Sequence, residues 1–124
     1  MSNDRNLENL KKGWADLAEG NMDSLAAAYT EDMIFVLPGQ NDVLQGRQGF
    51  REALDNIGAA LPPGFDITDL RYCVGVNEIT SIVEWKSEKI PAGSQSAVLF
   101  KFDPDGLVTE ERWFVDTEQW KAAF

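Results

Sequence analysis

The spacing of apolar residues changes along this chain, from a helical period in the first half to strand-like runs in the second. Amphipathic helices are expected over residues 4–19, 22–29 and 50–61, because apolar side chains recur there every three or four residues. The first carries a stripe of Leu7, Leu10, Trp14 and Leu17. The second is expected to present Met22, Leu25, Ala26 and Tyr29 on one face. Helices placed before most strands are typical of an α+β domain rather than a parallel α/β sheet.

Five strands are expected, most of them in the second half of the chain. The apolar run of residues 33–37 is short and ends at Pro38-Gly39, which favours a strand. A polar loop is expected over residues 38–46. The turn at residues 103–106 (Asp-Pro-Asp-Gly) predicts a hairpin. The later strands are expected near residues 65–75, 77–90, 95–103 and 106–116. A curved sheet under three helices leaves a cavity inside its curve.

Length and charge narrow the functions that this chain supports. Its 124 residues suit one domain spanning residues 1–124. The 21 acidic and 11 basic residues give a net charge of −10, which disfavours nucleic-acid and anionic-membrane partners because both need clustered Lys and Arg. The polar first residues do not resemble a signal peptide, and no apolar run has the length of a membrane span. A cytoplasmic location is therefore expected.

The composition also limits the available chemistry. The sequence has no histidine and one cysteine, Cys73, which excludes a disulfide within the chain and catalysis by a Ser-His or Cys-His pair. Zinc, copper and haem sites need several His or Cys ligands. A carboxylate site for magnesium or calcium stays open, although no EF-hand-like spacing occurs. We expect no metal and no cofactor. If the protein is an enzyme, its catalytic acid or base is therefore expected to be a carboxylate.

Three motifs occur in an order that resembles a known family. Residues 20–32 (GNMDSLAAAYTED) resemble the "G-D-x-D-x-L-x-x-L-Y/F-A-x-D" run of the SnoaL-like branch of the nuclear-transport-factor-2-like superfamily. Gly46-Arg47 resembles that family's helix entry, and residues 106–116 resemble its closing strand. The resemblance implies a cone-shaped, mixed, mostly antiparallel sheet, three N-terminal helices, a central apolar pocket and a homodimer formed through the sheet. The alternating residues Val98, Phe100 and Phe102 are expected to form that dimer surface.

The same resemblance locates the positions that hold catalytic groups in relatives. The carboxylate base of steroid isomerases falls at Leu37, and their oxyanion-hole tyrosine falls at Gly13. The aspartate that cyclases and epoxide hydrolases carry on the final strand falls at Trp113. Leucine and glycine cannot take a proton, and an indole N–H only donates. We therefore expect that this chain is not a steroid isomerase, whose mechanism needs both groups.

Glu111 is the candidate general acid or base that remains. Alternation places it on the same face of the last strand as Trp113. If that face lines the cavity, burial raises the pKa of the Glu111 carboxyl toward neutrality. The alternative is a solvated or salt-bridged residue of a strand. Glu84 has the same two interpretations, with a cross-strand charge pair as its alternative.

Large apolar side chains are expected to line the pocket, although each is also a candidate for ordinary core packing. The predicted ligand-binding residues are Trp14, Tyr29, Phe35, Leu37, Phe50, Leu54, Trp85 and Trp113. They suit a small apolar or aromatic molecule, and Asn41 and Asp42 are candidate contacts on the loop at the pocket mouth. Two functions stay open: a binding protein without chemistry, and a cofactor-independent cyclase, isomerase or dehydratase that uses an interior carboxylate.

Overall fold

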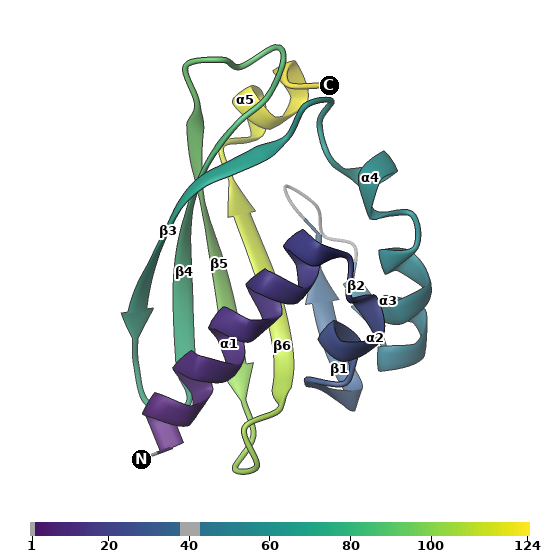
Figure 1. Cartoon of the computed structure of the whole chain (residues 1–124), viewed down its shortest axis with the longest axis vertical. Coiled ribbons are helices and arrows are strands. Elements are labelled where there is room, and N and C mark those ends of the chain that lie inside the picture. Colours follow the sequence, from purple (N-terminus) through teal and green to yellow (C-terminus); the bar gives the residue numbers. More distant parts are fainter. Residues whose placement is uncertain (1, 38–42) are drawn as a thin grey trace.

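The computed structural model describes residues 2–37 and 43–124, and its centre is a mixed sheet partly covered by helices (Figure 1). The sheet order is β2-β1-β6-β5-β4-β3. The strands are β1 (Tyr29–Val36), β2 (Val43–Gln45), β3 (Asp66–Val74), β4 (Glu78–Lys86), β5 (Ser94–Phe102) and β6 (Val108–Val115). All neighbours pair antiparallel except β1 and β6, which are parallel. The α+β class with a mixed, mostly antiparallel sheet is confirmed.

The helices are α1 (Ser2–Glu19), α2 (Met22–Ala26), α3 (Arg47–Leu54), α4 (Ile57–Ala60) and α5 (Thr117–Ala122). Helix α1 runs obliquely across the lower half of the sheet, α2, α3 and α4 lie on the side of β1 and β2, and α5 lies at the upper end (Figure 1). Gly20 ends α1 with a φ of 79°, a conformation that glycine adopts without a steric cost. No helix in the described part of the chain combines the length and apolar composition that crossing a membrane requires.

Three local expectations need correction. The third expected helix is two helices, α3 and α4, because the chain turns at Asp55 and Asn56. The expected loop over residues 38–46 contains β2, which pairs with β1, while residues 38–42 lie outside the described part of the chain. The last helix is capped by Asp116 and not by Thr117, because the Asp116 carboxylate accepts from the Gln119 N–H at 3.1 Å.

Tyr29 lies on a strand and not on the second helix. That helix ends at Ala26, and Tyr29 opens β1, where it pairs with Val108 of β6. The Val108 N–H also donates to the Ala28 carbonyl at 2.9 Å. Pairing with a distant strand therefore overrides the local helical period.

The core lies between the helices and the inner face of the sheet. Alternate residues of β4 and β5 point into it, among them Val83, Trp85 and Val98, each at most 1% exposed. Phe100 and Phe102 are also buried, at 3% and 6% exposure. The predicted dimer surface of Val98, Phe100 and Phe102 is therefore wrong, because this row packs inside its own chain.

Candidate functional site

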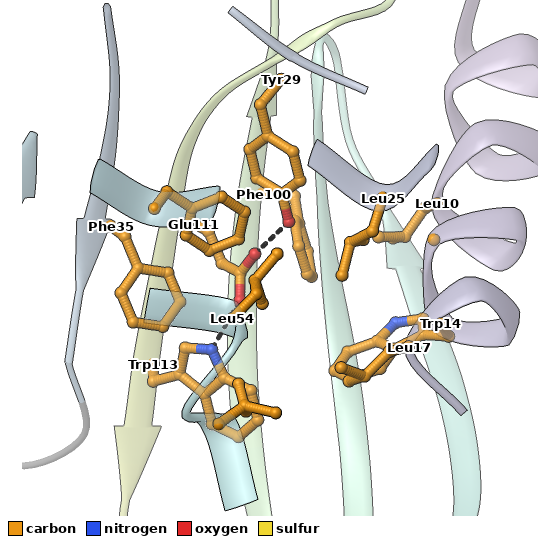
Figure 2. Close-up of a pocket in the computed structure, with 13 residues that line it drawn as sticks. Leu10, Trp14, Leu17, Leu25, Tyr29, Phe35, Leu54, Phe100, Glu111 and Trp113 are labelled. Atoms are coloured by element: carbon orange, nitrogen blue, oxygen red, sulfur yellow. Dashed lines mark hydrogen bonds between the residues drawn. The ribbon is translucent and has the colours of Figure 1, made fainter. Parts of the chain in front are cut away.

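A cavity of about 60 Å³, which we call the inner cavity, lies between the helices and strands β1, β5 and β6 (Figure 2). Its lining comes from seven elements and is almost entirely apolar. The lining residues are Leu10, Gly13, Trp14, Leu17, Leu25, Tyr29, Phe35, Phe50, Leu54, Ile57, Phe100, Glu111 and Trp113. Among the residues that the structure describes, Glu111 is the only charged one in this lining.

Glu111 occupies the middle of the sheet, where both neighbouring strands shield it. It lies opposite Phe35 of β1 and Phe100 of β5, and its exposed fraction is 6%. The Tyr29 hydroxyl donates to Oε1 of the carboxylate, and the Trp113 indole N–H donates to Oε2 at 2.7 Å (Figure 2). The carboxylate is thereby held by one donor on each oxygen, inside an otherwise apolar wall.

This environment brings the Glu111 carboxyl close to a neutral pKa. Burial raises its pKa from the ordinary 4.5 to about 7, against the opposing effect of the hydrogen bonds from Tyr29 and Trp113. Burial and the adjacent carboxylate raise the pKa of Tyr29 well above its ordinary value, so this phenol stays protonated and remains a donor. Near neutral pH, Glu111 therefore populates both its acidic and its basic form.

A larger cleft of about 510 Å³, which we call the outer cleft, adjoins the inner cavity. The two share Phe35, Phe50, Leu54, Ile57 and Trp113. The remaining described residues of the outer cleft are Leu37, Leu44, Ala53, Ala60, Leu61, Trp120, Lys121 and Phe124. Trp113 lines both spaces, and its indole N–H is the one that donates to Glu111.

Trp14 forms the wall of the inner cavity on the α1 side (Figure 2). Its indole N–H donates to Oγ of the fully buried Ser81 at 3.1 Å. Its ring meets those of Phe100 and Trp113 edge to face, with centroids 6.0 and 6.2 Å apart. These contacts fix the indole in one orientation.

The structure brings together most of the predicted pocket residues. Those that line the inner cavity are Trp14, Tyr29, Phe35, Phe50, Leu54, Glu111 and Trp113. Leu37 lines only the outer cleft, whereas Trp85 lines neither space. The Trp85 indole is 1% exposed, donates to Ser96 Oγ at 2.9 Å and packs against Phe65, so the structure assigns it to the core.

The positions without catalytic groups also face the site. Gly13 borders the inner cavity and Leu37 the outer cleft, so both lie where the resemblance places them, with no group to move a proton. Phe100, expected on the outer face, also lines the inner cavity. So do residues that the helical periods predict only as core, namely Leu10, Leu17, Leu25 and Ile57.

The other polar candidates do not join the site. Glu84 is on the outer face, 3.7 Å from Arg71 and accepting from Gln95 at 2.9 Å, which confirms the charge-pair interpretation. Asn41 and Asp42 lie outside the described residues. Within residues 2–37 and 43–124, no three His, Cys, Asp or Glu side chains gather as a metal site would require.

Comparison with known families identifies the fold. The sequence model of the SnoaL-like domain matches residues 11–111, which is most of the chain. The chain belongs to the SnoaL-like family. This membership confirms the resemblance drawn from the motifs, and a search of curated proteins found no match for this SnoaL-like protein.

Solved structures of similar fold include proteins of different functions. A protein assigned provisionally as a polyketide cyclase, from Xanthomonas campestris pv. campestris, has a TM-score of 0.80 and 14% identity over 99% of this chain and 98% of its own. TerC, co-crystallised with polyporic acid, has a TM-score of 0.77 and 14% identity over 94% and 95%. An LEH-like epoxide hydrolase from M. tuberculosis has a TM-score of 0.74 and 14% identity over 96% and 88%. At this identity the likeness shows the fold alone.

Proposed function

We propose that this SnoaL-like protein binds a small, mostly apolar molecule and acts on it as a cofactor-independent acid/base enzyme, with Glu111 moving the proton. The observation that carries the proposal is a titratable carboxyl buried in an otherwise apolar cavity. Burying a charge costs several kcal/mol, so stability alone does not account for a glutamate at this position. A carboxyl with a pKa of about 7 is suited to accept and return a proton at neutral pH.

The contacts of Glu111 define the reactions that it supports. Tyr29 and Trp113 fix the carboxylate plane and use two of its roughly four acceptor sites, which leaves room for a substrate proton. As the carboxylate, Glu111 removes a proton from a carbon or hydroxyl of the substrate. As the acid, it returns that proton at another atom. Isomerisation, cyclisation and dehydration follow this scheme, in which one group serves first as base and then as acid.

The volumes of the inner cavity and the outer cleft indicate that each holds a different part of the ligand. The inner cavity of about 60 Å³ holds roughly two water molecules. The outer cleft of about 510 Å³ falls within the range of small-molecule sites. The body of the ligand therefore lies in the outer cleft, and its reacting end passes Trp113 to reach Glu111.

A binding protein without chemistry is the second candidate, and one observation favours it. Both oxygens of Glu111 already accept hydrogen bonds from the protein, as expected of a buried carboxylate that has a structural role only. In that case the ligand occupies the outer cleft and no proton moves. The structural neighbours support a small-molecule site in either form, since TerC was crystallised with polyporic acid and another neighbour is an epoxide hydrolase.

Base-catalysed opening of 5-nitrobenzisoxazole tests the proposal without knowledge of the natural substrate. This flat, neutral molecule loses a ring proton to a base, its N–O bond breaks, and a coloured phenolate forms. We expect turnover that rises with pH through an apparent pKa of about 7, because only ionised Glu111 accepts the proton. Glu111→Gln should lower the rate at least about a hundredfold.

Glu110→Gln is the matched control for this test. Glu110 lies on the opposite face of β6 and pairs with Arg112 at 3.2 Å, so its loss should leave turnover unchanged. Equal rates for wild type and Glu111→Gln would refute the enzyme proposal. If both also bind the probe, as followed by tryptophan fluorescence, the second candidate is the right one.

A further inference from the structure

The outer cleft has one charged residue in its described lining, and that residue is a cation. Lys121 lies at the cleft among apolar side chains that include Leu61, Trp120 and Phe124. We infer that the ligand of the outer cleft is an apolar molecule carrying one acidic group, a carboxylate or an acidic phenol, whose anion pairs with the Lys121 ammonium. This inference rests on the proposed function and names the ligand class of the same site.

The structure holds Lys121 in a defined place through its helix. The Asp116 carboxylate caps α5, and Trp120 packs against Phe65 and Trp85 with ring centroids 6.1 and 5.4 Å away. Trp120 is therefore anchored on the core, and the next residue is carried to the mouth of the cleft. Figure 1 shows α5 at the same end of the molecule as α4, whose Ile57 and Ala60 line the cleft.

Charge complementarity selects an anion over a neutral ligand. The chain carries a net charge of −10, so most of its surface repels anions. Many of its cations have a carboxylate partner, as Lys12 has Asp16 at 2.9 Å and Arg51 has Asp55 at 2.7 Å. Within the described residues, Lys121 has no such ion pair. An acidic ligand thus meets an uncompensated cation beside an apolar surface.

The same arrangement sets the orientation of the ligand. An acidic group turned inward would lie among apolar side chains and near the Glu111 carboxylate, where desolvation and like-charge repulsion oppose it. An acidic group at Lys121 stays partly hydrated, and the apolar body fills the cleft toward Trp113. Lys121 is therefore a specificity-determining residue that directs the uncharged end of the ligand to the inner cavity.

Two probes of nearly the same shape test this inference, 2-naphthoate and 2-naphthamide. Their affinities are measured by titration calorimetry at low and high salt. Wild type should prefer the naphthoate about three- to tenfold at low salt, and less at high salt, because a partly exposed ion pair is modest and screened. Lys121→Gln should remove the preference and leave the amide affinity unchanged, while Lys121→Arg keeps it.

Lys86→Gln is the matched control, because Lys86 is exposed on β4, outside the lining of either space. It removes the same charge and should keep the naphthoate preference. A preference that survives in Lys121→Gln, or is lost equally in Lys86→Gln, overturns the inference. If wild type binds the amide and naphthoate equally, the inference fails and the proposed function stands. If neither probe binds, both fail.

Discussion

Replacing Glu111 by glutamine tests whether ionisation of the buried carboxyl lowers the stability of the folded protein. Glutamine has the shape of the protonated acid and does not titrate. Burial raises the Glu111 pKa from 4.5 to about 7. At about 1.36 kcal/mol per pKa unit, the ionised carboxylate lowers the free energy of unfolding by about 3 kcal/mol. Glu111→Gln should remove this penalty and stabilise the protein by that amount at alkaline pH.

The direction of the pH dependence follows from which state ionises first. Below about pH 4.5 the carboxyl is protonated in the folded and the unfolded chain, and the penalty is absent. As the pH rises from 4.5 to about 7, the unfolded chain ionises while folded Glu111 keeps its proton, so the wild type loses stability. Above about pH 7 folded Glu111 ionises too, and the loss levels off.

Urea unfolding followed by tryptophan fluorescence, from about pH 5 to about pH 9, measures this difference. The stability of Glu111→Gln minus that of the wild type should grow with pH by about 3 kcal/mol. Subtraction cancels other titrating groups and any constant effect of the amide, and Glu110→Gln serves as the control. A difference that is the same at every pH would refute the reasoning, because Glu111 would then ionise as easily inside the protein as in water.

Three further changes have defined outcomes. Tyr29→Phe removes a hydrogen-bond donor that lowers the Glu111 pKa, so the pH-dependent loss of stability should extend above about pH 7. At alkaline pH the free energy of unfolding should fall by about 1–3 kcal/mol. A pH profile of stability that does not shift would contradict this. Asp116→Ala should cost about 1 kcal/mol in urea unfolding, because α5 loses its capping bond to the Gln119 N–H. We also propose a homodimer through the outer face of the sheet, where Phe114 is 52% exposed. Sedimentation should show that the wild type is a dimer and that Phe114→Glu is a monomer. A monomeric wild type would exclude the proposed dimer.

Features that depend on nearby residues were predictable from the sequence. The helical stripe around Leu10 and Trp14 predicted α1, because periodicity is a local property. The turn at residues 103–106 also follows local rules, since the Asp103 carboxylate accepts from the N–H groups of Asp105 and Leu107 at 2.9 Å each. Such elements form where the chain's own neighbours specify them.

The assignment of sheet faces was less predictable, because alternation defines two faces without saying which one is buried. Phe100 was predicted outside and Glu111 was a candidate for the inside, but these residues are cross-strand partners and share one face. Val98 and Trp113 are partners in the same way. Only the register between β5 and β6 shows that these predictions exclude one another, and the register depends on pairing that single-strand patterns do not contain.

The parallel pairing of β1 with β6 has a consequence for the order of folding. Strands β3 to β6 pair in sequence and can form as the chain emerges, whereas Tyr29 finds its partner Val108 only 79 residues later. During synthesis β1 can pair with β2, but its other edge has no partner strand until β6 has been made. Long-range closure of this kind slows folding and exposes the nascent chain to aggregation. The strand that carries Glu111 is thus also the one that completes the sheet.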